Sequence, residues 1–151
     1  RADGNRPQGG DVVAGEPDVN GEGGVPQAVV NFECIGQGPT RLRKYLGDVF
    51  GWEFDVPSRV SQEVSEPASY GFLDLVTSED GTGIRSGIGG GAGYASHAVF
   101  YVGVPNVEAA LQRAEKLGGT RVMGPATSPT GLVVGPFTDP AGTPMGVAGV
   151  A

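Results

Sequence analysis

Between residues 28 and 150 the same order of predicted strands and helices occurs twice. Few folds are compatible with such a repeat. Each half begins with a strand pattern, passes through a Gly- or Pro-containing break into a helix pattern, and ends with three short strand patterns. The sequence therefore predicts an α+β protein of two βαβββ modules within a single domain, residues 27–150.

The first module is predicted for residues 27–88. Residues 28–35 form a strand pattern, and the helix pattern that follows can begin at Pro39 or Thr40. Its apolar stripe has i, i+3, i+4, i+7, i+8 spacing and consists of Leu42, Tyr45, Leu46, Val49 and Phe50. Gly51 is the residue expected to end the helix. The remaining strands of this module are predicted at 52–56, 70–76 and 84–88.

The second module is predicted for residues 96–150 and repeats the order. A strand pattern at 97–104 precedes Asn106, which is a favourable helix N-cap, and Gly118 is expected to end the helix. The apolar stripe of this helix consists of Val107, Ala110, Leu111, Ala114 and Leu117. The remaining strands are predicted at 120–123, 132–137 and 145–150, with a Pro-rich loop at 124–130.

Residues 89–95, between the modules, are rich in glycine and are predicted to be a flexible linker. A dinucleotide-binding glycine motif follows a strand and opens a helix, whereas this run leads into another strand. The glycines therefore do not indicate a nucleotide site.

Five short motifs lie in the order VFGWEF at 49–54, YVGV at 101–104, VEAA at 107–110, KLGG at 116–119 and FTDPAG at 137–142. Together they resemble the vicinal oxygen chelate superfamily, which includes glyoxalase I, bleomycin-resistance proteins and extradiol dioxygenases. The resemblance spans residues 28–149. It implies a curled mixed sheet whose halves enclose a cleft, and a homodimer. The alternative is an unrelated ferredoxin-like tandem.

The resemblance also implies where a metal would bind, since metal-dependent members take one ligand from the first strand of each module and one from a later strand of each. Those places fall on Asn31, Asp74, Val99 and Gly146 in this sequence. Such members use His, Gln or Glu, whereas Val99 and Gly146 offer no side-chain donor. His97 lies two residues before Val99 and replaces one ligand at most. We therefore expect no metal and no cofactor.

Strand periodicity predicts which side chains face the cleft. If Asn31 faces inward, Glu33 does too, and the same alternation applies along the other strands. The predicted ligand-binding residues are Asn31, Glu33, Trp52, Tyr70, Phe72, Asp74, His97, Val99 and Tyr101. The alternatives are that His97 caps a strand edge in solvent, and that Glu33 and Asp74 are surface charges on a flatter sheet.

Aromatic walls with a few carboxylates are typical of a pocket for a small aromatic or cationic molecule. The first hypothesis is therefore a metal-independent binding protein of the bleomycin-resistance type. The second is an isomerase, lyase or cyclase in which Glu33 or Asp74 is the base and His97 or Tyr101 the acid. Binding and catalysis use the same cleft, so the sequence does not separate them.

Residues 1–26 differ in composition from the rest of the chain. They contain seven Gly, three Pro and five carboxylates, with Val12 and Val13 as the one large apolar pair. Such a segment buries too little surface to offset the entropy of ordering it, so a flexible arm is predicted. The alternative is that the valine pair docks on the domain or on a partner. A third functional hypothesis is an interaction module that acts through this acidic arm.

The net charge, the single cysteine and the single histidine exclude several classes of protein. Ten Lys and Arg against 17 Asp and Glu give a net charge of −7, which opposes binding to nucleic acid. The single cysteine, Cys34, excludes an internal disulfide, and the single histidine, His97, excludes a two-histidine iron centre. No apolar stretch reaches the roughly 18 residues of a membrane span, and no signal-peptide pattern occurs. We therefore expect a cytoplasmic protein.

Overall fold

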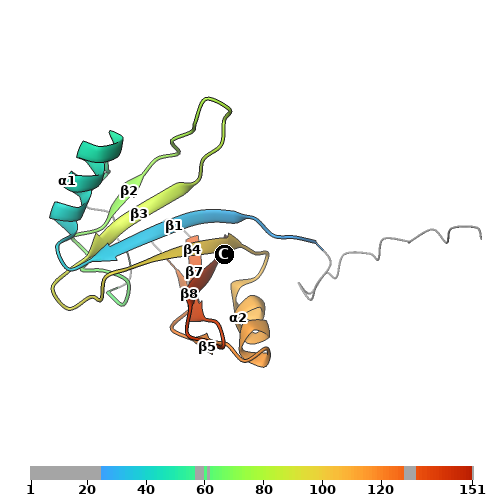
Figure 1. The fold of residues 1–151 in the computed structure, drawn as a ribbon. Helices are drawn as coiled ribbons and strands as arrows, with labels where there is room; N and C mark the ends of the chain where they lie inside the picture. Colours follow the sequence, from blue (N-terminus) through green and yellow to red (C-terminus); the bar gives the residue numbers. More distant parts are fainter. Residues whose placement is uncertain (1–24, 57–59, 61, 128–131, 151) are drawn as a thin grey trace, which may run out of the picture.

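The computed structural model describes residues 25–56, 60, 62–127 and 132–150, so that the predicted arm lies almost entirely outside it. In the described residues the chain forms two helices and eight strands (Figure 1). Their order is β1 (Val29–Gly36), α1 (Pro39–Phe50), β2 (Gly71–Leu73), β3 (Arg85–Gly90), β4 (His97–Gly103), α2 (Val107–Lys116), β5 (Thr120–Arg121), β6 (Ala126–Thr127), β7 (Leu132–Thr138) and β8 (Pro144–Val150). The predicted α+β class is confirmed. Neither helix is long and apolar enough to cross a membrane.

The strands form one mixed sheet with internal symmetry. Its order is β2-β3-β1-β4-β8-β7-β5, and β6 pairs with β7 beside this path. In the middle, β1 and β4 run antiparallel, with Phe32 opposite Phe100. On each side the next strand is parallel, β3 to β1 and β8 to β4, and the strand beyond it is antiparallel. The two halves are therefore related by an approximate two-fold axis at the Phe32–Phe100 pair.

Local signals fix the ends of both helices. Pro39 occupies the first turn of α1, where its missing N–H breaks no hydrogen bond. Gly51 ends α1 in the left-handed conformation at φ 72°, and its amide donates to the Gly47 carbonyl at 2.8 Å. Asn106 caps α2, since its Oδ1 accepts a hydrogen bond from the Ala109 amide at 2.9 Å.

The strand predicted at 52–56 is wrong in extent. This segment makes only one bridge, between Asp55 and Phe72. The Trp52 ring instead packs against the Phe50 ring at 5.0 Å and the Phe32 ring at 6.0 Å between centroids. These contacts hold the start of the segment against the face of the sheet that carries α1, so a regular strand does not form.

Two neighbouring strand boundaries also differ from the prediction. The strand expected at 70–76 covers only Gly71–Leu73, so the alternation of side chains does not extend to Asp74. The strand expected at 84–88 runs from Arg85 to Gly90 and takes in the first two residues of the predicted linker 89–95. These glycines are buried in the sheet, and a Cβ at Gly89 would meet the Tyr70 ring at 2.5 Å.

The two faces of the sheet are packed differently. We call the face that carries Glu33 and Tyr101 the inner face and the face that carries the helices the outer face. On the inner face Val99, Tyr101 and Ala148 form a buried cluster with Leu132 and Val134. On the outer face α2 buries Val107 and Leu111 against Val147. By contrast, α1 is loosely packed: of its apolar stripe, Tyr45, Val49 and Phe50 are 64%, 52% and 59% exposed.

Candidate functional site

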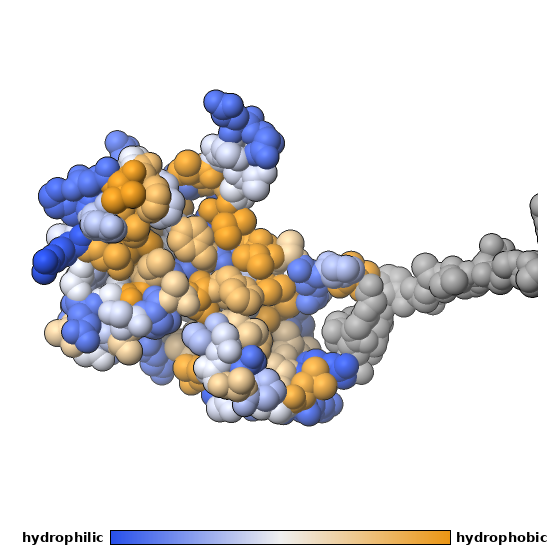
Figure 2. Space-filling model, viewed as in Figure 1, coloured by the Kyte–Doolittle hydropathy of each residue, from blue (hydrophilic) through white to orange (hydrophobic). Residues whose placement is uncertain are grey.

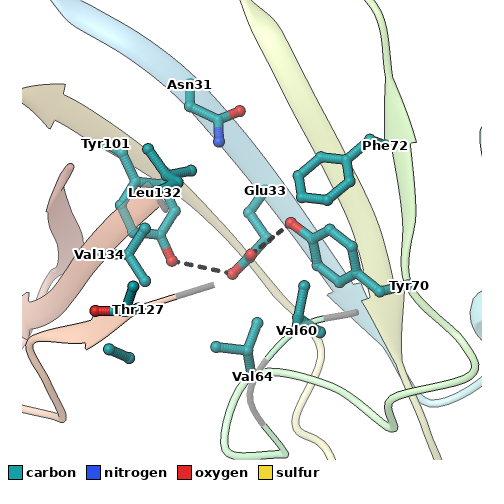
Figure 3. A pocket seen from close by; sticks show the side chains of 11 residues that line it. Asn31, Glu33, Val60, Val64, Tyr70, Phe72, Tyr101, Thr127, Leu132 and Val134 are labelled. Atoms are coloured by element: carbon teal, nitrogen blue, oxygen red, sulfur yellow. Dashed lines mark hydrogen bonds between the residues drawn. The ribbon is translucent and has the colours of Figure 1, made fainter. Parts of the chain in front are cut away.

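A buried carboxylate lies at the centre of the inner face. Glu33, on β1, is only 7% exposed. Its Oε2 accepts a hydrogen bond from the Tyr70 hydroxyl at 2.7 Å, and its Oε1 accepts one from the Tyr101 hydroxyl at 3.1 Å. The two phenols approach from opposite sides of the carboxylate, Tyr70 from the residue before β2 and Tyr101 from β4 (Figure 3). Both oxygens of a buried charge are therefore hydrogen-bonded.

Glycines make room for the two tyrosines. Gly87 lies beside Glu33 on β3, and a Cβ added there would meet the Tyr70 hydroxyl at 1.8 Å. Gly146 lies beside Tyr101 on β8, and a Cβ there would meet the Tyr101 ring at 2.5 Å. Each phenol thus occupies the space beside a strand position that has no side chain. The two positions correspond under the internal two-fold axis.

Burial controls the protonation of this group. Desolvation raises the pKa of the Glu33 carboxyl above its usual value, and the hydrogen bonds from Tyr70 and Tyr101 and the charge of His97 offset part of that shift. Burial and the adjacent carboxylate raise the pKa of both tyrosines, that of Tyr70 strongly. The phenols consequently remain protonated donors, and Glu33 is the group of the three that changes charge closest to neutral pH.

A small inner cavity of about 40 Å³ lies beside Glu33. Its wall is mainly apolar, and its polar atoms come from Asn31, Glu33, Thr127 and the two tyrosines. The residues lining it are Asn31, Glu33, Val60, Val64, Tyr70, Phe72, Tyr101, Ala126, Thr127, Leu132 and Val134 (Figure 3).

A larger cavity of about 260 Å³ adjoins it on the same inner face of the sheet and shares Glu33, Val64 and Tyr101 as walls. We call it the outer cavity. Exposed His97 lines this cavity from the start of β4, with its Nδ1 2.7 Å from the Ala95 carbonyl oxygen. The residues lining it are Glu33, Glu63, Val64, Gly93, Tyr94, Ala95, His97, Val99, Tyr101, Val122, Met123, Pro136, Phe137, Pro144 and Met145. Glu33 and Tyr101 thus form part of both walls.

Most of the predicted site residues line these two cavities. Asn31, Tyr70 and Phe72 line the inner cavity, His97 and Val99 line the outer one, and Glu33 and Tyr101 line both.

Trp52 and Asp74 lie elsewhere, in a separate open groove beside β2 that they share with Phe72. Asp74 is outside any strand and exposed, and Trp52 is held by the aromatic contacts of α1 and β1.

Several lining residues have no sequence signal that marks them. Val60, Glu63 and Val64 come from the residues between the strands predicted at 52–56 and 70–76, and Ala126 and Thr127 come from the Pro-rich loop predicted at 124–130. Leu132 and Val134 belong to a predicted strand, and strand alternation alone places them on one face without saying which. Only the pairing of β7 with β8 decides that they face Glu33.

The side chains at the four implied metal positions do not form a divalent-metal site. Tyr101 lies over Gly146, Val99 is a hydrocarbon in the inner cluster, and Asp74 lines the separate groove. Only Asn31 remains as an oxygen donor near Glu33. Among the described residues, no group of three or more His, Cys, Asp or Glu side chains is placed to hold a metal ion. The donor set therefore does not fit the metal of the superfamily.

Comparison with known proteins gives a likeness in structure only. No family model matches the chain, and no curated protein matches its sequence. A variant of Streptomyces coelicolor methylmalonyl-CoA epimerase in complex with 2-nitronate-propionyl-CoA has a TM-score of 0.59 at 13% identity, covering 82% of this chain and 94% of that one. A methylmalonyl-CoA epimerase in complex with methylmalonyl-CoA and NH4+ gives 0.58 at 13% identity, with 83% and 95% covered.

The hypothetical protein BH1468 from Bacillus halodurans C-125 has a TM-score of 0.57 at 9% identity, covering 83% of this chain and 95% of that one. At such identities the likeness concerns the fold alone. It extends over both modules, as does the internal symmetry of the sheet. The chain therefore has the vicinal oxygen chelate fold, as the resemblance of its motifs implied.

Proposed function

We propose that this protein binds a small aromatic or cationic molecule in the two cavities of the inner face, without a metal ion. The observation that carries the proposal is the placement of Glu33, a buried carboxylate that forms part of both cavity walls. A buried charge is costly to desolvate, and a ligand that pairs with it recovers part of that cost. Apolar cavities with a few convergent polar groups are typical of small-molecule sites.

The charges of the lining residues favour this class of ligand. Among the described residues that line either cavity, Glu33 and Glu63 carry carboxylates and none is Lys or Arg. Aromatic rings from Tyr70, Phe72 and Tyr101 stand beside the carboxylate of Glu33. Carboxylates with aromatic faces attract cations and disfavour phosphate or carboxylate ligands. Nothing in this lining resembles a site for the phosphate groups of the CoA esters that the structural relatives bind.

The experiment is a thermal-shift screen of matched aromatic compounds that carry a cationic, neutral or anionic substituent. A ligand present at about a hundred times its Kd stabilises the folded state by about 2.7 kcal/mol, which raises Tm measurably. We expect cationic and neutral aromatics to raise Tm and their anionic analogues not to. A screen in which no compound raises Tm, or only anions do, would refute the proposal.

The metal-independent part of the proposal has its own test. The side chains at Val99 and Gly146 offer no donor, so we expect EDTA, Co²⁺ and Ni²⁺ to leave Tm and ligand affinity unchanged. Native mass spectrometry of protein purified without added metal should give the mass of the polypeptide and of any retained organic ligand. A stoichiometric divalent ion in that spectrum would contradict it.

A second candidate function is acid–base catalysis by Glu33. The observation that favours it is the raised pKa of this carboxyl, held in one place by two phenol donors beside a cavity. A carboxyl of raised pKa is suited to taking a proton from a substrate carbon or heteroatom. Once a ligand has been found, NMR in D2O would test for deuterium uptake at its C–H positions. Uptake that persists in both Glu33→Gln and His97→Ala would exclude this mechanism.

We also infer that two copies of the chain associate through the outer face. Apolar side chains gather over the middle of the sheet, along β1 (Figure 2). Phe100 of β4 is 41% exposed there, and Val30 of β1 is 44% exposed. The loosely packed stripe of α1 adds Phe50 to this area. A contiguous exposed apolar area in a soluble domain is typical of an interaction surface.

A further inference from the structure

The polar atoms of the inner cavity point to one chemical group. We propose that this cavity holds the primary ammonium group of the ligand, which donates hydrogen bonds to Glu33 and to Asn31 while the body of the ligand occupies the outer cavity. The inference rests on the proposed function, because it presupposes that a small molecule binds on the inner face. It specifies, in addition, that the ammonium end of that molecule contacts Glu33.

The size of the inner cavity limits which end of a ligand can enter it. The cavity measures about 40 Å³. A site for one water molecule needs roughly 10–15 Å³, whereas an apolar cavity that binds benzene measures about 150 Å³. An ammonium group therefore fits, whereas an aromatic ring or a bulkier trimethylammonium group does not. The outer cavity of about 260 Å³ is large enough for a ring, and it meets the inner cavity at Glu33 and Tyr101.

The inner cavity contains carboxylate and amide oxygens that can each accept a further hydrogen bond. The Oδ1 atom of Asn31 is buried and has no hydrogen-bond partner among the described residues. Each Glu33 oxygen accepts one phenol hydrogen bond and retains a further lone pair. The hydroxyl protons of Tyr70 and Tyr101 are already used on Glu33. The other donors of the lining are the Asn31 amide nitrogen, which lies toward Glu33 (Figure 3), and the Thr127 hydroxyl. A primary ammonium has three donors and no acceptor, so it can satisfy these oxygens together.

The electrostatics agree. The ring of Phe72 lies 5.1 Å from that of Tyr70 at an angle of 65°, and both rings form the wall beside Glu33. Aromatic faces next to a carboxylate stabilise a desolvated cation. The nearest basic residue in register is Arg85, opposite Asn31 on β3, but it is exposed and does not line the cavity. No described side chain therefore already neutralises Glu33 from within the cavity.

The proposal has a definite pH dependence. An ammonium ion pairs with the ionised form of Glu33, so its affinity should fall as the pH drops through the pKa of this carboxyl, which burial has raised. The titratable groups that face Glu33 are Tyr70, Tyr101 and His97, with Cys34 adjacent and Glu63 across the outer cavity. Since burial and the adjacent carboxylate keep both phenols protonated, the ionisation of Glu33 itself sets the pH dependence expected of this site.

The probes are benzylamine, benzyl alcohol and benzyltrimethylammonium chloride. Each is titrated into the 151-residue protein, and binding is followed by ¹H–¹⁵N NMR. They share one ring and differ only in the head group. We expect benzylamine to bind at least about tenfold more tightly than either analogue above the pKa of Glu33, with shifts centred on Asn31, Glu33 and Tyr101. In Glu33→Gln this preference for benzylamine should disappear. In Glu79→Gln, which makes the same substitution at an exposed residue in the turn between β2 and β3 that lines neither cavity, it should be unchanged.

The wild-type comparison of head groups does not depend on any variant folding well. Equal affinity for benzylamine and benzyl alcohol, or full benzylamine affinity in folded Glu33→Gln, would overturn the ammonium subsite. The ammonium subsite would also be overturned if benzylamine did not bind but a different compound from the thermal-shift screen, tested separately, bound in the outer cavity. In that case the proposed function would still stand. If no compound of the screen binds, the proposed function fails as well.

Discussion

Glu33 is a carboxylate buried under two phenols, and its hydrogen bonds compensate only part of the cost of removing it from water. Hydrogen bonds to a charged group are stronger than neutral ones, but a carboxylate in a protein interior loses far more solvation than two bonds restore. Its raised pKa expresses that imbalance. A residue of this kind weakens the fold, and such departures from good core packing are expected at functional sites.

The pH dependence of stability should reveal this group. Because the folded-state pKa of Glu33 is raised, its contribution to stability is fully present below the pKa of the unfolded chain and is lost as the pH rises through the folded pKa. Glu33→Gln removes the titration. We therefore expect wild type to lose stability relative to Glu33→Gln as the pH rises from 4 to 8, measured by urea unfolding of both proteins. A difference that does not vary with pH would show that this carboxyl is not desolvated in solution.

Removing one phenol donor should shift the pKa of Glu33 further. Tyr101→Phe deletes the 3.1 Å hydrogen bond and leaves a buried carboxylate oxygen with one donor fewer. We expect the pKa of Glu33 to rise, and stability above that pKa to fall by about 1–3 kcal/mol. The ¹³C chemical shift of the Glu33 carboxyl, followed by NMR across the pH range, measures the first effect. Tyr45→Phe is the control, because Tyr45 is 64% exposed on α1 and distant in the fold.

At the scale of the elements, glycine has a structural role in β3 and β8. Gly87 and Gly146 leave space that the rings of Tyr70 and Tyr101 fill. Part of the glycine-rich segment that resembles a linker therefore belongs to strand β3. The absence of side chains in this strand leaves room for the Tyr70 ring. A glycine in a strand often marks such a close approach.

Substitution of these glycines should separate the tyrosines from Glu33. In Gly87→Ala the new methyl group would lie 1.8 Å from the Tyr70 hydroxyl, so the ring must move. We expect a loss of about 1–3 kcal/mol of stability and a further rise in the pKa of Glu33. The matched control is Gly93→Ala, where a Cβ would meet nothing within 4 Å. Equal stability of the two variants, from urea denaturation curves, would contradict the packing described.

Much of the fold could be predicted because its signals are local. Helix stripes, the cap at Asn106 and the left-handed Gly51 depend on residues a few positions apart, and these elements are present where expected. The strand at 52–56 was not predictable in extent because contacts of Trp52 with Phe32, distant in sequence, decide its course.

The residues of the candidate site also fall into a predictable and an unpredictable group. Strand alternation placed Asn31 and Glu33 on one face, and the structure has both beside one cavity. It failed for Asp74, since β2 ends at Leu73. The cavity walls at Val64 and Leu132 depend on loop positions and strand pairing, which periodicity does not encode.

At the scale of the whole molecule, the exposed apolar outer face is the surface through which we propose that two copies associate. Phe100 lies opposite Phe32 on the internal two-fold axis, and it is 41% exposed. A partner would bury this face, so we expect wild type to be a dimer and Phe100→Asp to be a monomer with unchanged secondary structure. Size-exclusion chromatography with light scattering measures the mass.

The control for association is Leu117→Asp, which places the same charge at an exposed apolar residue just beyond α2. It should remain dimeric. A monomeric wild type, or dissociation of both variants alike, would contradict an interface centred on β1 and β4.

The two-fold axis of the sheet relates the backbones of the two modules but not their chemistry. Glu33 and Tyr101 occupy corresponding positions, each beside a glycine on the neighbouring parallel strand, Gly87 and Gly146. One half thus contributes an acid and the other the phenol that hydrogen-bonds to it. Two copies of the first half would set two carboxylates against each other, and two copies of the second would leave two hydroxyls with no anion to share. The halves are alike in backbone, but only together do they give a buried carboxylate with a phenol donor at each oxygen.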